Sequence, residues 1–225
     1  MRPLVRVTQL EKFRRYMSGN YPYETEEGLV ANITQEFTGN EYTRVGTAFH
    51  SIVETGRTGE ATPDGHAIDV DGFKVLMDDA QCETALAYKA EFPQAFHEVR
   101  LYHDLGGITV TGQADLVNGQ EIRDIKTKYS PVSDGDYTDS CQWRLYLQLF
   151  QMDVFHFDIF VFEGYDKGRN GYDVRGLKLT RHTPPITCYR YHGMEADNER
   201  LAREFMEWAR KRELTKYLTK DGQID

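Results

Sequence analysis

Two short apolar segments around an Asn-Gly pair constrain the fold of this chain most strongly. Residues 113–130 read QADLVNGQEIRDIKTKYS, with Leu116 before the pair and Ile122 and Ile125 after it. Asn-Gly between segments of this kind is the strongest short-range signal for a β-hairpin. The pattern predicts two antiparallel strands with a buried apolar face, although two carboxylates and a lysine lie within the same strands.

The segments around this hairpin extend the sheet. Residues 97–105 alternate between apolar and polar side chains and residues 108–117 are rich in β-branched residues, which predicts three successive antiparallel strands. A helix expected over 138–153 leads to a strand over 154–163. That crossover is long enough to make strands 121–127 and 154–163 parallel, with a right-handed connection.

Four further segments complete the expected architecture. Residues 57–73 contain Gly, Pro and Asp and indicate a surface loop, and residues 75–92 indicate a helix that ends before a proline. A last strand is expected within 173–183, and a long helix over about 195–218. Together these elements predict an α/β fold in which helices flank both faces of a mixed sheet of about five strands.

The N-terminal part is expected to be mostly helical. Thr8 stands three residues before Glu11, the spacing of a capping box, and residues 18–43 indicate an irregular or weakly helical connection. A second helix is expected to end at Gly56, a residue type that suits a helix C-terminus. Its buried face is predicted from apolar residues spaced at i, i+3, i+4, i+7 and i+8, which are Val45, Ala48, Phe49, Ile52 and Val53.

The composition sets broad limits on the kind of protein. A chain of 225 residues fits one domain, and no apolar run reaches the ~18 residues that a membrane span needs. The first residues, MRPLVRVTQLEKF, do not resemble a signal peptide, so a cytoplasmic location without a membrane partner is expected. The net charge of −9 argues mildly against a nucleic-acid partner, but a net value can conceal a basic groove.

The charged residues within the hairpin suggest chemistry. Asp124 and Lys126 are two apart on one strand and therefore share a face, while Asp115 can reach Asp124 from the neighbouring strand. Two converging carboxylates repel each other unless a proton or a cation lies between them. Oxygen ligands favour a hard cation such as Mg²⁺ or Mn²⁺, which would suit metal-assisted phosphodiester hydrolysis. From Asp-x-Lys alone, a surface ion pair on an edge strand remains the simpler interpretation.

Four motifs in order strengthen the chemical interpretation. They are Gly46 to His50 in a helix, Gly112 to Asp115 in a strand, Asp124-Ile125-Lys126-Thr127 in the next strand, and Gln142 to Tyr146 in the following helix. In this order and spacing the chain resembles the RecB-like branch of the PD-(D/E)XK nuclease superfamily, over about residues 7–163. The resemblance implies a single domain over 1–225. It would have a restriction-endonuclease-like core at about 44–182, a helical N-terminal segment 1–43 and the C-terminal helix.

The resemblance also implies a metal site. Asp115 and Asp124 would hold Mg²⁺ or Mn²⁺, His50 would be a further ligand, and the backbone carbonyl of Ile125 would complete the protein's share. Without the resemblance, a histidine beside an apolar helical face is more often a residue of the core or its boundary.

The same resemblance assigns catalytic and supporting roles. Lys126 would orient or activate the attacking water and stabilise the phosphate in the transition state. Gln142 and Tyr146 would support Lys126 and contact the DNA backbone, and Glu98 in the first meander strand would assist at the site. Taken by itself, Tyr146 would be interpreted as a core aromatic.

The number and spacing of the cysteines differ from those of some members of this family. Some relatives carry four cysteines for an iron–sulfur cluster, one after the opening helix and three near the C-terminus. Here Tyr16 stands near the first position, and the three cysteines are Cys82, Cys141 and Cys188, which have no metal-ligand spacing. We therefore expect no iron–sulfur cluster.

The combined prediction is a divalent-metal-dependent DNA exonuclease that processes ends in recombination or repair, with a phage origin as one interpretation. It would contact the DNA backbone with little sequence specificity. A recombinase or a single-strand-binding protein is a candidate partner, and a homo-oligomer is open. The alternatives are a structure-specific endonuclease and a catalytically silent DNA-binding or assembly module on the same fold.

Overall fold

The central sheet contains the predicted meander. The computed structural model describes residues 2–34 and 39–218. Strands β5 (Phe96–Leu105), β6 (Ile108–Asn118) and β7 (Glu121–Lys128) are consecutive and antiparallel. Strand β8 (Val154–Phe162) is parallel to β7, as the crossover predicts. The hairpin and the mixed sheet are therefore confirmed.

The sheet is larger than expected. It has seven strands in place of about five. The expected last strand is β9 (Leu179–Arg181), which pairs with β8, and the two additional strands are β1 (Leu4–Arg6), parallel to β6, and β10 (Ile186–Tyr189), which pairs with β8. The sheet therefore includes two strands, β1 and β10, that lie outside residues 44–182. The strand expected within 173–183 is short because the Gln81 side chain binds the carbonyls of Val174 and Leu177 and holds that stretch as a turn.

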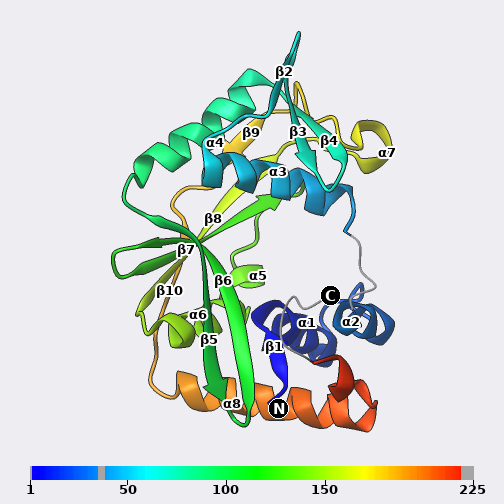
Figure 1. Cartoon of the computed structure of the whole chain (residues 1–225), viewed down its shortest axis with the longest axis vertical. Helices are drawn as coiled ribbons and strands as arrows, with labels where there is room; N and C mark the ends of the chain where they lie inside the picture. The colour runs from blue at the N-terminus through cyan, green and yellow to red at the C-terminus, as the bar shows by residue number, and fades with distance from the viewer. Residues whose placement is uncertain (1, 35–38, 219–225) are drawn as a thin grey trace.

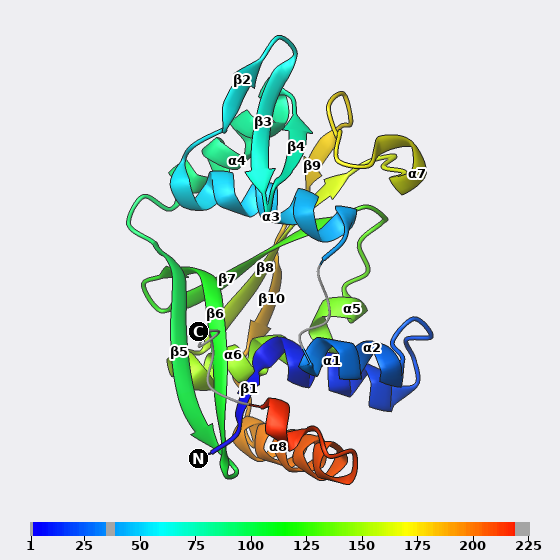
Figure 2. The same cartoon turned by 45° about the vertical axis from the view of Figure 1, so that its right-hand side comes forward.

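Strands β6 and β7 separate part-way along their length. Their backbone pairing runs from Asn118↔Glu121 to Leu116↔Arg123. Beyond that point β6 continues beside β1 and β5, whereas β7 continues beside β8. Figures 1 and 2 show the two strand pairs diverging, β5 and β6 toward the lower end and β7 and β8 toward the upper end. The sequence motifs lie where this separation begins.

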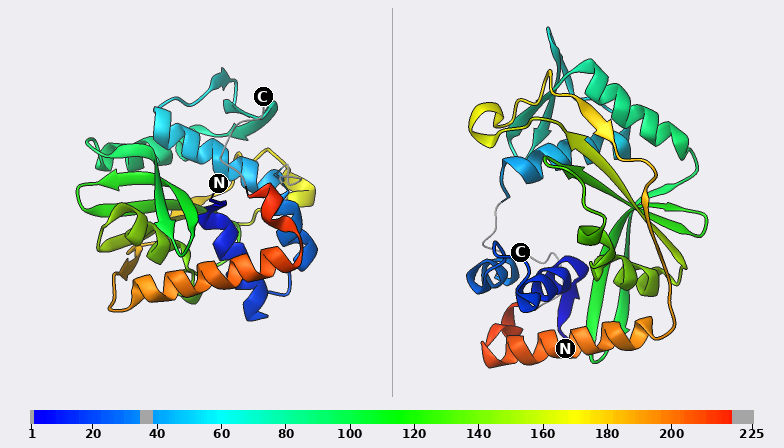
Figure 3. Two further views of the ribbon diagram at one scale, coloured as in Figure 1. Left: turned by 60° about the horizontal axis from the view of Figure 1, so that its bottom comes forward. Right: turned by 180° about the vertical axis from the view of Figure 1, so that it is seen from behind.

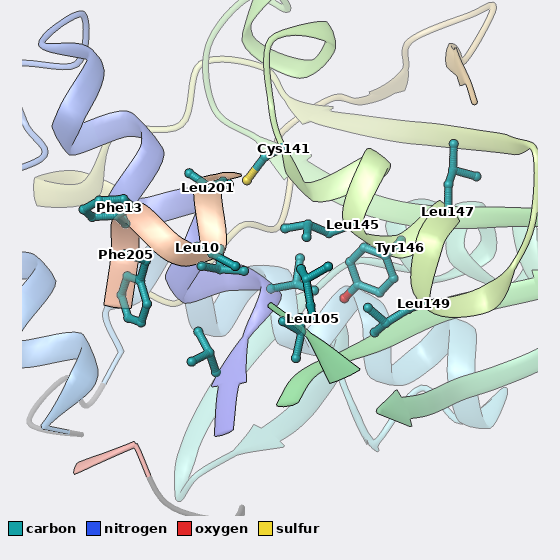
Figure 4. Close-up of a cluster of buried hydrophobic side chains, with 14 of the residues drawn as sticks. Leu10, Phe13, Leu105, Cys141, Leu145, Tyr146, Leu147, Leu149, Leu201 and Phe205 are labelled. Atoms are coloured by element: carbon teal, nitrogen blue, oxygen red, sulfur yellow. The ribbon is translucent and has the colours of Figure 1, made fainter. Parts of the chain in front are cut away.

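Helices cover both faces of the sheet, as predicted. On one face, α1 (Val7–Ser18), α2 (Glu26–Ile33), α6 (Gln142–Phe150) and α8 (Met194–Lys211) share one hydrophobic core (Figure 4). Helix α8 runs along the lower end of the molecule (Figure 3). It is followed by a 3-10 turn, η1 (Leu214–Tyr217), so the expected helix over 195–218 is two elements.

A second core lies on the opposite face. It is formed by α3 (Glu41–Thr55) and α4 (Asp79–Glu91) against residues of β7 and β8. All five apolar residues predicted for the buried face of α3 are buried, and the helix ends at Gly56 with φ 71°. Among the described residues, no helix combines the length and apolar character that crossing a bilayer requires.

The loop predicted over 57–73 is wrong. Strands β2 (Glu60–Thr62), β3 (Gly65–Val70) and β4 (Phe73–Met77) form a separate three-stranded sheet that packs against α3. Pro63-Asp64 and Asp71-Gly72 are the turns of two tight hairpins, while Ile68, Val70 and Val75 are buried. The helix expected from residue 75 consequently begins only at Asp79.

Other predicted boundaries also shift. Helix α1 begins at Val7, and the Arg6 amide donates to the Gln9 side chain at 2.9 Å, so Thr8 and Glu11 are not a capping box. The helix expected over 138–153 is divided into α5 (Gly135–Thr138) and α6. A short helix, α7 (Lys167–Asn170), interrupts the Gly-rich connection after β8. Within the expected helical segment 1–43, residues 1 and 35–38 lie outside the described residues.

Candidate active site

The site begins where the β6–β7 pairing ends. Asp115 is the next residue of β6 beyond the last backbone pair, and its Oδ2 accepts a hydrogen bond from the Ile125 amide at 2.6 Å. The Asp115 carboxylate thus takes the place of a β6 backbone carbonyl as the acceptor for this β7 amide. Its other oxygen, Oδ1, faces a residue of helix α3.

His50 is that partner. Its Nδ1 lies 3.6 Å from Asp115 Oδ1, within reach of an ion pair. Helix α3 comes close to β7 because Gly46 has no side chain; a Cβ there would lie 2.7 Å from Thr127 Oγ1. Burial alone would lower the pKa of His50, but the Asp115 carboxylate raises that pKa above its usual value. The reciprocal attraction outweighs the effect of burial on Asp115 and lowers the pKa of its carboxyl.

Glu98 reaches the same place from β5. It stands opposite Asp115, between the backbone pairs of its two neighbours, and its φ of 52° is unusual for a residue other than glycine. The Gln113 side-chain amide donates to the Glu98 carboxylate. Burial and the charge of Asp115 raise the pKa of Glu98.

Three donor atoms meet at this point. One ligand atom each from His50, Glu98 and Asp115 lies within 4.8 Å of the others, the only such group of three among the described residues. Nitrogen and oxygen atoms at these separations can share one cation. The geometry therefore gives Glu98 a more central position than the sequence suggested.

Asp124 makes a different set of contacts. Its Oδ1 accepts a hydrogen bond from Gln142 Nε2 at 3.1 Å, and its Oδ2 lies 2.6 Å from Lys126 Nζ. The 2.6 Å contact is an ion pair at a buried carboxylate oxygen. Burial raises the pKa of Asp124 to about 6, and nearby Asp115 adds to the rise. Asp124 lies outside the group formed by His50, Glu98 and Asp115.

Two of the predicted site residues lie on α6. Gln142 binds Asp124 and not Lys126 directly. Tyr146 is only 4% exposed, and its hydroxyl donates to the Gln113 carbonyl at 2.7 Å. In this conformation the ring is too buried to contact a DNA backbone. Tyr146 instead fixes β6 beside α6, just before Asp115.

Sequence reasoning missed Glu11. Its buried carboxylate binds Arg14 and Arg15 on α1 and accepts the Cys141 amide at 2.8 Å, at the start of α6. The Arg14 and Arg15 side chains outweigh burial and lower its pKa to about 2. This contact sets the position of α6, and hence of Gln142. The sequence does contain a signal for this role, because Glu11 lies among the apolar residues on the buried face of α1.

Two adjoining cavities give access to these side chains. The larger, about 1100 Å³, is lined by His50, Glu98, Asp115, Ile125 and Lys126 together with residues of α3. The smaller, about 230 Å³, lies on the other side of Lys126 and contains Gln142. Asp115 and Lys126 are therefore accessible from an open cleft.

Comparisons with known proteins support the fold. The chain matches no protein-family model and no curated protein. A solved structure described as "Putative exonuclease" from Eubacterium rectale aligns with a TM-score of 0.53 at 12% identity, covering 97% of this chain and 83% of that one. The chain shares that α/β architecture. A phage related exonuclease from Haemophilus somnus 129PT aligns with a TM-score of 0.48 at 13% identity, covering 94% and 97%.

Proposed function

We propose that this chain is a divalent-metal-dependent nuclease of the RecB-like PD-(D/E)XK branch that shortens DNA from an end. The observation that carries the proposal is one cleft lined by His50, Glu98, Asp115 and Lys126, in which Lys126 is paired with the buried Asp124. The shared architecture with a protein described as an exonuclease supports it. The continuous central sheet supports a single nuclease domain.

The side chains fit a hard divalent cation. His50, Glu98 and Asp115 offer one nitrogen and two carboxylates within 4.8 Å, and Asp124 is a further buried carboxylate, paired with Lys126. Asp115 and Asp124 with the Ile125 carbonyl remain the ligand set that the motifs imply. When bound, Mg²⁺ or Mn²⁺ would polarise the phosphate and lower the pKa of a bound water.

Lys126 has the position of a catalytic cation. Burial would lower its pKa, but Asp124 and Asp115 raise it, so the side chain stays an ammonium group at neutral pH. A fixed positive charge beside a phosphate stabilises the charge that develops during hydrolysis. Gln142 holds Asp124, and Asp124 holds Lys126, which directs the ammonium group toward the cleft.

A digestion panel tests the proposal. Linear and closed circular DNA of one sequence are incubated with Mg²⁺, Mn²⁺ or a chelator, and products are resolved over time. An end-dependent nuclease shortens the linear form, spares circles and is inactive with the chelator.

Other outcomes would contradict the proposal. If circles are opened as fast as linear DNA is shortened, the protein is an endonuclease and not an exonuclease. DNA binding without any cleavage would indicate a silent binding module. A recombinase or a single-strand-binding protein would be a suitable partner for the strand that an end-processing enzyme exposes.

A further inference from the structure

Strand β5 lies at one edge of the central sheet (Figure 2). It is ten residues long and contains no proline, and its backbone pairs are with β6. Among the described residues, no strand pairs with its outer side. The amide and carbonyl groups along such an edge are placed to pair with a strand from another molecule.

The outward-facing backbone groups of β5 belong to alternate residues. The Thr109 amide of β6 donates to the Pro3 carbonyl on the β1 side at 2.9 Å, so it does not bind Asp104, its partner on β5. In an antiparallel ladder, the backbone groups of such a pair point away from each other. The amide and carbonyl of Asp104 therefore face outward, and the alternation along the strand extends this to Tyr102 and Arg100.

The side chains of these three residues lie on the uncovered face of β5. Tyr102 is 55% exposed, and the other two are also exposed. Arg100 donates to Gln113 and Gln113 donates to Glu98, so the same face continues into the candidate active site. The opposite face of the strand packs against α6 and α8. A partner strand would therefore meet an exposed, structured edge.

The sequence of this edge is complementary to itself. When two copies of β5 lie antiparallel about Tyr102, Arg100 of each copy faces Asp104 of the other. Two pairs of opposite charge then flank a pair of tyrosines, and both kinds of cross-strand pair are favourable. Within the chain Asp104 pairs with Arg2, and Arg100 binds Gln113. Both contacts are exposed to solvent, and the attraction between copies acts in addition to them.

We infer that β5 is a dimer interface, at which two copies of this chain join their central sheets edge to edge. Arg100, Tyr102 and Asp104 would each exchange backbone hydrogen bonds with the residue opposite. The twofold axis of such a pair is perpendicular to the sheet, so both clefts open on the same side of the joined sheet. Contact along one strand buries little surface, so the dimer is reversible, with a dissociation constant in the micromolar range.

Sedimentation velocity over a wide range of protein concentration tests the inference. Wild type passes from monomer to dimer as the concentration rises. Arg100→Asp or Asp104→Arg alone places like charges opposite each other at two points, which weakens the dimer by about tenfold or more. An equal mixture of the two variants associates again, because each copy then meets the opposite charge in the other. Lys178→Asp is the matched control, since Lys178 is 71% exposed and lies outside β5.

Backbone amide exchange locates the interface. The amides of Arg100, Tyr102 and Asp104 exchange more slowly at concentrations that form the dimer than in the monomer. Unchanged exchange at these residues overturns the inference, as does a wild type that stays monomeric at its highest soluble concentration. A dimer that Arg100→Asp leaves intact, or a mixture of the two variants that stays monomeric, overturns it too. None of these measurements involves DNA, so they are independent of the proposed nuclease function.

Discussion

The Asp115 carboxylate accepts the Ile125 amide at 2.6 Å, at the point where β6 and β7 stop pairing through their backbones. One side chain therefore has two tasks. It closes the hairpin beyond Leu116↔Arg123, and it presents its second oxygen to His50. This relationship explains how charged residues occupy a sheet interior: they stand where β6 and β7 cease to pair with each other.

Asp115→Ala is expected to lower both activity and stability. The change removes a carboxylate from the site and leaves the Ile125 amide without its acceptor, which costs about 1–3 kcal/mol for a buried donor. Thermal melting and cleavage of linear DNA are measured on the same preparation. An Asp115→Ala protein that melts at the wild-type temperature would show that water or a backbone shift satisfies the amide.

Asp124→Ala is expected to abolish cleavage but to raise the melting temperature without metal. The folded-state pKa of about 6 lies above the usual aspartate value of 3.8, so ionised Asp124 opposes folding at neutral pH. Removing it should stabilise the fold by about 1 kcal/mol or more at pH 7. The gain disappears as the pH falls from about 6 through 3.8, where the wild-type carboxyl becomes protonated. Melting with a chelator across this range is the measurement; cleavage at the wild-type rate by a folded Asp124→Ala protein would end the nuclease proposal.

Lys126→Met is expected to lower the rate of cleavage by about 10²–10³-fold, the usual effect of removing one group that stabilises transition-state charge. The fold should persist, since the methionine retains most of the aliphatic stem. Single-turnover rates at saturating DNA report the chemical step. Lys178→Met is the control, because Lys178 is 71% exposed and pairs only with Glu163 among the described contacts; an equal loss there would indicate a general effect of charge.

Glu11→Gln is expected to destabilise the protein in a pH-dependent way. The folded-state pKa of about 2 lies below the usual glutamate value of 4.5, so ionised Glu11 stabilises the fold fully above pH 4.5. That contribution is on the order of 3 kcal/mol and is lost as the pH falls toward 2. Denaturant unfolding of both proteins at pH 7 and at about pH 4 should show the difference shrinking. If the difference in unfolding free energy between the two proteins is the same at both pH values, the effect comes from packing and not from the charge of Glu11.

Gly46→Ala is expected to impair cleavage by displacing α3. Its Cβ would lie 2.7 Å from Thr127 Oγ1, so either the Thr127 side chain or the helix that carries His50 must shift, and we expect the helix to move away from β7. Thr127→Ala removes the clashing oxygen, and the double variant should therefore be more active and more stable than Gly46→Ala alone. Thr127→Ala by itself provides the reference. A double variant that is no better than Gly46→Ala would show that another contact governs the approach of α3.

The sequence by itself determined the local features of the site. Asn-Gly and the flanking apolar residues specify the hairpin because turn chemistry and side-chain alternation act over a few residues. The same is true of the buried face of α3, where the i, i+3, i+4 spacing is a property of any amphipathic helix. The parallel arrangement of β7 and β8 followed from the length of the crossover.

Only the tertiary structure decided how these pieces meet. The separation of β6 from β7 depends on β1 and β8, which compete for their edges from distant parts of the chain. The position of Glu98 depends on a positive φ within β5, and that of Gln142 depends on Glu11 from α1. Such contacts join residues far apart in the sequence, and their free energies come from burial and charge pairing that no local pattern records.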